Sequence, residues 1–335
     1  SDEPGGVNMV SIKDVAKRAG VAVSTVSKVI NGYPNVSEGT KKKVRQAIDE
    51  LHYVPNAIAA ALSSKSSTRI AMLVNSSQHS SSIDEIDMKY LSGALAEAKE
   101  KGLEIRTFFF SMFEDMKCED IIRDFESQRI GALIFYGINR NDQVMWDLIR
   151  HEQFKSVLVD TPIVEKNISS VWIDQAQAQF DVAEKTYPQV NGKKLLYVAG
   201  KKDGYVTGGR IEGITRFAEK YGMELIVRYG DFSEEKARDI VLEDGKDADM
   251  IACASDLMAL GAMFAVRKLG KKVPICGFDG IGLLEYAEES INSVRQDFAG
   301  ISAEAVREAM RLIKGGTGKN IIMDYELVTP EYGVH

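Results

Sequence analysis

Several carboxylate, hydroxyl and amide side chains in this sequence come directly after short apolar runs. Each run is typical of a buried strand, and the polar residue stands where that strand ends. Because open parallel sheets bind ligands beyond the carboxyl ends of their strands, these groups would converge on one cleft suited to a polyhydroxylated molecule. Taken singly, each residue could be only a turn former or a helix cap, as Ser255 could be. The candidates are Asn75, residues 137–139, Asp160, Ser255, Asp256 and Asp279.

The elements that would position these residues begin near residue 70, where short apolar strands alternate with longer helical patterns. The expected strands are 70–74, 104–110, 132–136, 156–159, 194–199, 224–228, 250–254 and 273–278. The expected helices include 88–101, 118–127, 175–186, 209–221, 234–243 and 257–269. This alternation predicts parallel, doubly wound sheets, and about nine strands suit two small sheets better than one large sheet.

Three short helical patterns precede this region and predict a separate small domain. The tight joint at residues 19–21, around Gly20, is the turn that a helix-turn-helix needs, and a third helix begins after Ser37. The sequence therefore predicts a DNA-binding domain. The apolar residues that share one face of each helix are Ile12, Val15, Ala16 and Ala19, then Val26, Val29 and Ile30, then Val44, Ala47, Ile48 and Leu51.

The distribution of charge supports this prediction. Residues 1–69 hold ten Lys and Arg against six Asp and Glu, a net charge of +4, so residues 70–335 carry −11 of the total of −7. A basic head on an acidic body directs the positive field to a phosphate backbone. Taken alone, the lysine run at 41–43 could be only a solvated helix start.

Composition excludes several other classes of protein. The chain of 335 residues is 44% hydrophobic and 27% charged, as in soluble globular proteins of two or three domains. No apolar run approaches the roughly 18–20 residues that span a bilayer. Residues 1–9 lack the apolar segment of a secretory signal, and the three cysteines lack metal-binding spacing. We therefore expect a cytoplasmic protein without a membrane partner, a cofactor or a metal site.

Longer motifs carry a family resemblance. They are KDVAKRAGV, STVSKVING and LHYVPNAIAAAL in the N-terminal region, then RIEGITRF at 210–217, ASDLMALGA at 254–262, GFDG at 277–280 and INSVRQD at 291–297. With these motifs the sequence resembles the lactose-repressor (LacI/GalR) family of transcriptional regulators. The resemblance implies a small all-α helix-turn-helix headpiece and an α/β body like that of periplasmic binding proteins, with two doubly wound parallel-sheet subdomains.

The resemblance also implies domain boundaries, and the Ser-rich segment 63–68 supports the main one. We expect a disordered lead-in at 1–9, the DNA-binding domain at 10–55, a hinge helix and linker at 56–68, and the effector-binding and dimerisation domain at 69–335. Within that domain, the N-subdomain would comprise about 69–169 and 295–323, and the C-subdomain about 170–293 and 324–335.

Most of the DNA contacts implied by the resemblance lie in two helices. The second helix of the helix-turn-helix is the recognition helix, which begins at Val23. In it, Lys28 can bond a guanine, and Val23 is either a base contact or a partly buried helix-start residue. In the hinge helix, Leu62 would be a wedge in the minor groove, and Ala60 stands where many members carry Arg. The full expected set is Lys13, Val23, Ser24, Thr25, Ser27, Lys28, Asn31, Asn56, Ala59 and Leu62.

The effector contacts implied by the resemblance centre on Arg210, a donor for hydroxyls or a carboxylate, and on Asp279, an acceptor. The expected set is Asn75, Asp160, Arg210, Ser255, Asp256 and Asp279. Acidic residues at 84–87 replace the aromatic residues of sugar-binding members, which favours a neutral or cationic oligosaccharide or glycoside. Trp172, Tyr205 or Tyr136 could supply a replacement for the aromatic platform.

The predicted function is that of a homodimeric transcription regulator, a repressor, whose affinity for double-stranded operator DNA is set by a sugar-like effector. One alternative is a regulator co-repressed by a nucleobase or another metabolite. A solute-binding protein of a transporter is a different class, and the DNA-binding head argues against it. An enzyme is disfavoured because the sequence has no G-x-G-x-x-G after a strand, no P-loop and no set of nucleophile and base.

Overall fold

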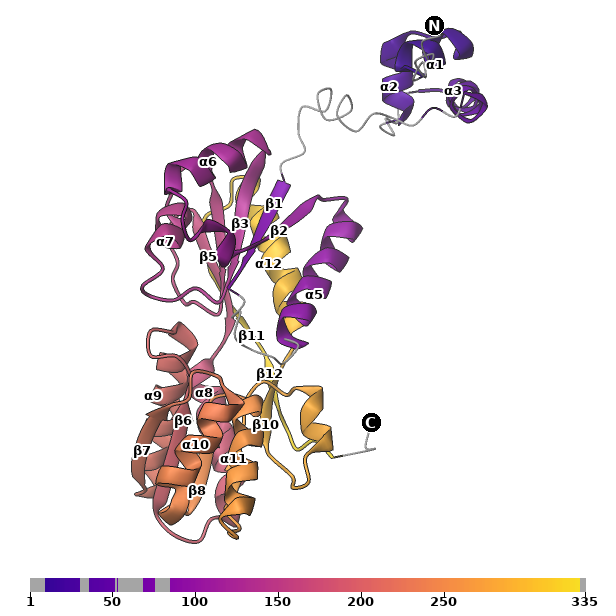
Figure 1. Cartoon of the computed structure of the whole chain (residues 1–335). Coiled ribbons are helices and arrows are strands. Elements are labelled where there is room, and N and C mark those ends of the chain that lie inside the picture. Colours follow the sequence, from indigo (N-terminus) through magenta and orange to yellow (C-terminus); the bar gives the residue numbers. More distant parts are fainter. Residues whose placement is uncertain (1–9, 31–35, 52, 54–68, 76–84, 332–335) are drawn as a thin grey trace, which may run out of the picture. The chain divides into compact units, whose positions relative to one another are not determined.

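The computed structural model describes residues 10–30, 36–51, 53, 69–75 and 85–331. The chain divides into two compact units, residues 1–67 and 68–335, which are described separately (Figure 1). The predicted lead-in at 1–9, the hinge helix and four of the predicted site residues lie outside the described residues. These four residues are Asn31, Asn56, Ala59 and Leu62.

The first unit contains three short helices, α1 (Ile12–Ala19), α2 (Val23–Ile30) and α3 (Glu38–Glu50). Gly20 ends α1 with a φ of 67°, a left-handed conformation that glycine adopts without steric strain. The Val21 amide donates to the Ala16 carbonyl at 3.1 Å and closes the turn toward α2. The Ser37 side chain accepts from the Thr40 amide and caps α3. The predicted helix-turn-helix is confirmed.

The headpiece core consists of the predicted apolar face of each helix. Helix α1 packs against both α2 and α3, and an ion pair joins Arg18 of α1 to Glu50 of α3. The buried members of this core are Val15, Ala16, Val26, Val29, Val44, Ala47 and Tyr53.

In the body, the N-subdomain is built on a parallel six-stranded sheet. Its order is β11 (Asn320–Met323), β5 (Ile168–Ile173), β4 (Lys155–Val159), β3 (Ile130–Tyr136), β1 (Arg69–Val74) and β2 (Ile105–Phe109). Helices α5 (Glu85–Lys101) and α12 (Phe298–Ile313) pack together, and α12 covers one face. Helices α6 (Cys118–Ser127) and α7 (Gln143–Ile149) enclose the core on the other face. The inner strands are buried on both faces of the sheet, and their sequences are therefore continuous apolar runs.

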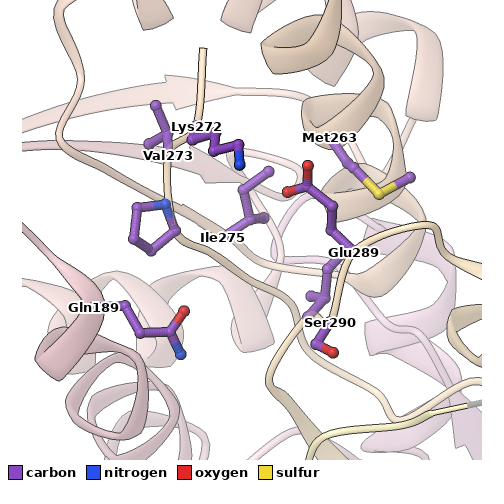
Figure 2. A pocket seen from close by; sticks show the side chains of 9 residues that line it. Gln189, Met263, Lys272, Val273, Ile275, Glu289 and Ser290 are labelled. Carbon is purple, nitrogen blue, oxygen red and sulfur yellow. The ribbon is translucent and has the colours of Figure 1, made fainter.

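The C-subdomain has a parallel four-stranded sheet in the order β7 (Glu224–Tyr229), β6 (Lys194–Ala199), β8 (Met250–Cys253) and β9 (Ile275–Cys276). Its helices pack in two pairs, α8 (Gln175–Thr186) with α9 (Tyr205–Tyr221), and α10 (Glu234–Asp244) with α11 (Asp256–Lys268). A cavity of about 230 Å³ opens at the amino end of β9, and Lys272, Ile275 and Glu289 are among the residues that line it (Figure 2).

Three chain segments cross between the subdomains, and each crosses at an aspartate. Asp174 separates β5 from α8, Asp297 separates β10 (Ser293–Gln296) from α12, and Asp324 separates β11 from β12 (Tyr325–Val328). Asp174 and Asp297 each cap the helix that follows, through the amides of Gln177 and Gly300. The first crossing therefore lies at residue 174 rather than at 169/170, because the whole of β5 belongs to the N-subdomain sheet.

The two main sheets are parallel, as predicted, but the described residues contain twelve strands rather than about nine. Strands β5, β10, β11 and β12 were not predicted, and β10 and β12 form an additional antiparallel pair. Strand β5 was missed because Ser169 and Ser170 interrupt its apolar pattern. Both hydroxyls are buried and bonded, Ser169 to the Glu308 carboxylate and Ser170 to the Thr161 carbonyl.

In the described part of the chain, no helix is long and apolar enough to cross a membrane. Within the same residues, no group of three or more His, Cys, Asp and Glu side chains could hold a metal ion. The three cysteines are free thiols, and Cys253 and Cys276 are buried.

Candidate functional site

The headpiece exposes one side of α2. Val26 and Val29 are buried in the core, while Val23 is 41% exposed and Ser24 and Lys28 are exposed. Ser24 and Lys28 are four residues apart and so share a helical face. Val23 is therefore accessible to an external partner although part of its side chain is covered, so its exposure fits both a base contact and a partly buried helix-start residue. Thr25 and Ser27 are half-buried beside this face.

Other basic side chains of the headpiece lie on α1 and α3. Lys13 is exposed on α1. In the lysine run, Lys41 forms an ion pair with Glu38 at 2.6 Å, whereas Lys42 and Lys43 are exposed. The first lysine thus belongs to a charged helix start, and the next two remain available to an external anion.

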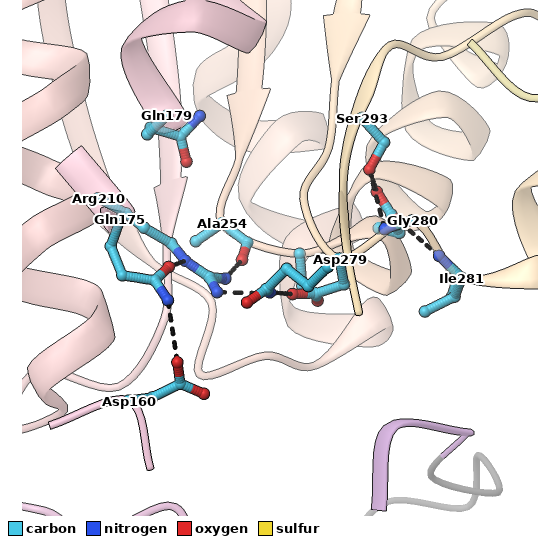
Figure 3. Close-up of polar contacts among 12 residues, drawn as sticks. Asp160, Gln175, Gln179, Arg210, Ala254, Asp279, Gly280, Ile281 and Ser293 are labelled. Carbon is cyan, nitrogen blue, oxygen red and sulfur yellow. Dashed lines mark hydrogen bonds and ion pairs between the residues drawn. The ribbon is translucent and has the colours of Figure 1, made fainter. Parts of the chain in front are cut away.

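In the body, Arg210 is the centre of a buried polar network (Figure 3). Its Nε donates to Gln175 Oε1 at 2.8 Å, its Nη1 donates to the Ala254 carbonyl, and its Nη2 lies 3.5 Å from Asp279 Oδ1. The guanidinium also lies over the Phe278 ring, 3.7 Å from the centroid. Only 4% of Arg210 is exposed, and each of its three side-chain nitrogens has a partner in the protein.

The network continues into the N-subdomain through Gln175. The Gln175 Nε2 donates to Asp160 Oδ1 at 3.2 Å, and the Tyr90 hydroxyl donates to Asp160 Oδ2 at 2.7 Å. On the other side, Gln296 Nε2 donates to Asp279 Oδ1 at 3.1 Å. The network therefore joins carboxylates of both subdomains to one guanidinium.

Local backbone geometry explains how the sequence builds this network. Asp160 and Asp279 follow β4 and β9 with φ values of 59° and 115°, in a region that non-glycine residues rarely adopt. Such strain costs about 1–3 kcal/mol per residue and is found mainly at ligand sites. Gly213 allows α9 to approach α8, since a Cβ there would lie 2.0 Å from the Ala176 carbonyl oxygen. That close approach brings Arg210 beside Gln175.

The electrostatics of the network are unbalanced, because two carboxylates face one guanidinium. Burial, together with a smaller effect of the Asp160 charge, raises the pKa of Asp279 to about 7, against the lowering effect of Arg210. Burial also raises the pKa of Asp160, against the hydrogen bond from Tyr90. A ligand that donates hydrogen bonds to these carboxylates would replace part of the hydration that burial removed.

Three predicted effector residues have other partners. Asn75 Nδ2 donates to the Gly137 carbonyl at 2.8 Å and links the ends of β1 and β3. Ser255 caps α11 by accepting from the Met258 amide, which is the cap anticipated as an alternative. Asp256 accepts from Ser293 Oγ at 2.6 Å and from the Ile281 amide at 2.9 Å. The structure does not bring these three side chains into the Arg210 network, because each is held by local backbone or loop contacts.

A cavity of about 530 Å³ borders the network at Asp160 and Gln175. Residues of both subdomains line it, including the aromatic side chains of Trp172 and Tyr205. Its ionic lining consists of three carboxylates and two arginines, namely Asp160, Asp174, Glu212, Arg140 and Arg216. The acidic residues 85–87 are not among the described residues that line it. The smaller cavity at β9 shares no residue with the network.

Comparison with known proteins decides the family. Residues 11–56 match the bacterial regulatory proteins of the lacI family, and residues 67–281 match the periplasmic binding proteins and sugar binding domain of the LacI family. The chain belongs to the LacI family. Its headpiece is thus a DNA-binding domain, and its body is an effector-binding domain.

Full-length relatives of this LacI-family chain are transcriptional regulators. The chain is 27% identical to the HTH-type transcriptional regulator MalR of Clostridium butyricum, over 95% of this chain and 98% of the relative. It is 28% identical to the HTH-type transcriptional repressor PurR of Vibrio atlanticus (strain LGP32), over 91% and 92%. The family likeness therefore spans both domains.

Solved structures share the fold. The lac repressor dimer bound to operator and the anti-inducer ONPF matches with a TM-score of 0.78 and 22% identity, over 97% of this chain and 99% of that chain. The complex of the transcriptional regulator CelR with cellobiose matches with a TM-score of 0.67 and 24% identity, over 97% and 100%. These likenesses show that the chain shares the fold of these proteins.

Sequence reasoning missed several members of the network in this LacI-family body. Gln175 opens α8 directly after β5, so it could have been noticed only if β5 had been predicted. Gln296 ends β10, a strand of four residues whose partner lies about thirty residues later. Tyr90 lies near the start of the predicted helix 88–101, and Phe278 ends the predicted strand 273–278, so neither pattern marked them as members of a polar network. Asp160 and Asp279 were predicted because each follows a largely apolar strand that could be recognised in the sequence. No predicted strand precedes Gln175 or ends at Gln296.

A first prediction concerns the charge of Asp279. We compare the free energy of unfolding of Asp279→Asn with that of the effector-free wild type. As the pH rises from 5 to 8, this difference should shift by about 1–3 kcal/mol in favour of the variant. In wild type, the folded-state pKa of about 7 lies above the usual value for Asp, so the folded protein holds a proton that the unfolded chain has released. Wild-type stability therefore falls as the pH rises toward 7, and this loss is absent in Asn.

Thermal unfolding at several pH values measures this difference. The same series on Asp239→Asn, at the exposed surface of α10, provides the background to subtract. A difference between Asp279→Asn and wild type that stays constant from pH 5 to 8 would show that Asp279 is already ionised in the folded protein at pH 5.

Proposed function

We propose that the protein is a homodimeric transcriptional repressor in the cytoplasm, and that a sugar-like effector bound between its subdomains controls its affinity for operator DNA. One observation carries the effector site: Arg210, Gln175 and Asp160 form a hydrogen-bonded chain from one subdomain to the other. A ligand inserted there changes contacts on both sides at once. Binding would therefore couple to subdomain closure, typically with 1–3 kcal/mol of coupling free energy.

The charges favour a neutral polyhydroxylated effector, such as a glycoside or an oligosaccharide. The network holds two carboxylates against one guanidinium, and three carboxylates face two arginines along the adjacent cavity. An anionic sugar phosphate would add charge of the sign already in excess. The cavity of about 530 Å³ has room for a second ring, and Trp172 and Tyr205 offer apolar faces to it.

A second candidate is a nucleobase that acts as a co-repressor. The full-length likeness to the repressor PurR supports it, and the same aromatic side chains could stack on a base. A thermal-shift screen separates the two classes, with cellobiose and maltose as neutral sugars, glucose 6-phosphate as the anionic sugar, and hypoxanthine and guanine as bases. Stabilisation by the bases alone would favour the co-repressor, and stabilisation by the phosphate alone would contradict the charge argument.

Exposed apolar side chains support the homodimer. In the N-subdomain they lie on α5 and at the end of β2, and in the C-subdomain they lie on α11 and on the segment Gly282–Tyr286. Exposed apolar surface often marks a protein–protein interaction site, and a second copy of this chain is the partner proposed here. The residues, each 45–70% exposed, are Met88, Leu95, Phe109, Met112, Phe264, Leu283 and Tyr286.

Operator binding is tested by Lys28→Ala. We expect the protein to bind a pseudo-palindromic operator with steep salt dependence, because phosphate contacts release counterions. Lys28 is exposed on the same face as Ser24, so its removal should relax specificity at one symmetric base pair, at about 1–3 kcal/mol per half-site. Fluorescence anisotropy with a library of single base-pair changes measures the effect.

Lys42→Ala is the control for this experiment, because Lys42 is exposed on α3 rather than on the recognition helix. Its removal should weaken binding to all sequences alike, and reduce the salt dependence by about one ion per half-site. Two results would contradict the assignment of the Ser24 and Lys28 face to base recognition. One is equal preference of the wild type for every base at each position. The other is a loss of specificity in Lys42→Ala that matches the loss in Lys28→Ala.

A further inference from the structure

A single carboxylate of α5 joins the N-subdomain to the C-subdomain. Both oxygens of Glu85 accept from the Gly282 amide, at 3.0 and 3.2 Å. Glu85 is in the first turn of α5, whereas Gly282 opens the short helix η4 (Gly282–Tyr286) of the other subdomain. At the opening residue of a helix, the backbone amide has no partner within the helix, so an external acceptor satisfies it.

The segment that Glu85 holds also carries Asp279. Residues 279 to 282 run from the Arg210 network to η4, and Asp256 fixes their inner side through the Ile281 amide. The Asp256 carboxylate belongs to the C-subdomain, so the segment is anchored to its own subdomain at Ile281. It is anchored to the other subdomain one residue later.

Helix α5 contributes to the effector network as well. Its Tyr90 donates to Asp160, and the Tyr90 ring packs against Phe298 of α12, with centroids 5.2 Å apart. One rigid helix therefore contacts the network carboxylate of its own subdomain through Tyr90, and the segment bearing the opposite carboxylate through Glu85. Movement of α5 relative to η4 would change the distance between the two sides of the network.

We propose that Glu85 is a latch, a positioning residue that holds the Asp279-bearing segment against α5 and so stabilises the closed arrangement of the two subdomains. Its link to effector affinity rests on the function proposed above, whereas the latch itself does not. Other contacts also cross between the subdomains, including those from the Arg140 side chain and amide to the carbonyls of Gly204 and Asp203. Loss of Glu85 should therefore shift the population toward open forms without separating the subdomains.

The consequence follows from population arithmetic. An effector that contacts both subdomains binds the closed form, and its apparent Kd is the intrinsic value divided by the closed fraction. One charge-assisted hydrogen bond at a partly exposed position supports a shift of about three- to tenfold in the equilibrium constant between the closed and open forms, and the closed fraction falls accordingly. Glu85 would thus set the sensitivity of the regulator without being part of the cavity lining.

The latch can be tested without any effector, by spin-label distance measurements on the full-length protein. Labels at Glu126 of α6 and Glu243 of α10 report on the two subdomains, in a Cys118→Ser background in which Cys253 and Cys276 remain buried. We expect one main distance in this background and a second, altered population in Glu85→Ala. Glu85→Gln, which keeps one acceptor oxygen, should lie between them. Hydrogen exchange at the Gly282 amide should be faster in Glu85→Ala.

Lys89→Ala is the matched control, because Lys89 forms an ion pair with Glu85 at 2.6 Å on the same helix. It removes the ion pair and leaves the Gly282 contact in place. Unchanged distances and exchange in Glu85→Ala would overturn the latch, and so would an equal effect of Lys89→Ala. If the latch holds but the sugars and bases of the screen bind Glu85→Ala and the background protein alike, the proposed link between closure and effector fails instead.

Discussion

Replacing Arg210 with alanine is expected to abolish the response to the effector while operator binding persists. Arg210 supplies the only cation in direct contact with Asp279 among the described residues, and it orients Gln175 toward Asp160. Without it, the donors that would bind effector hydroxyls are gone, and the two carboxylates of the network lose their shared counter-charge. We expect at least a hundredfold loss of effector affinity, because several charge-assisted hydrogen bonds are removed together.

Operator binding should be retained because the headpiece and the body are separate compact units with separate cores. The measurement is an operator-binding titration with and without the sugar that most stabilises the wild type. Arg228→Ala is the control, since Arg228 is an exposed arginine on β7, paired with Asp244 at 2.6 Å and distant in sequence from the network.

Stability must be separated from binding in this experiment. Arg210→Ala leaves two buried carboxylates without a counter-charge, and removing one member of a buried ion pair is costly. The double variant Arg210→Met with Asp279→Asn removes one charge of each sign and should recover stability without recovering the response. Calorimetric binding of the sugar to either variant at wild-type affinity would show that the effector lies elsewhere.

The sequence was informative wherever one local signal determined the structure. Gly20 and Ser37 mark helix boundaries through backbone conformation and capping, which depend on a few neighbouring residues. Asp160 follows an apolar run that is buried on both sheet faces, so the strand and its polar end were both readable. At such positions, the physical cause of the structure lies in neighbouring residues, so the local sequence is enough to predict it.

Other parts of the site depend on contacts between distant segments. Strand β5 tolerates Ser169 because Glu308, 139 residues later, accepts from its hydroxyl, and no local pattern reveals that partner. Without β5, Gln175 could not be placed at a sheet edge, although it connects Asp160 to Arg210. The position of Arg210 itself was suggested by the family resemblance, since nothing in the pattern of α9 distinguishes it from a surface arginine.

Disrupting the exposed apolar surface of the body is expected to convert the protein to monomers and to weaken operator binding by two orders of magnitude or more. Phe264 of α11 and Leu95 of α5 are 58% and 47% exposed, on different subdomains. A glutamate at each position would place a charge in any interface that buries it, and two copies of the change would face each other across a twofold axis. The double variant Leu95→Glu, Phe264→Glu should therefore be monomeric at micromolar concentration.

The effect on DNA follows from bivalence. In a dimer, the second headpiece binds its half-site at an effective concentration in the millimolar range, a gain of about 10²–10⁴ that a monomer loses. Analytical ultracentrifugation and operator titration on the same samples measure both changes. Tyr229→Glu is the control, because Tyr229 is 41% exposed at the end of β7, an edge strand of the C-subdomain sheet. A dimeric double variant would place the interface elsewhere, and a monomer with wild-type operator affinity would show that one headpiece suffices for recognition.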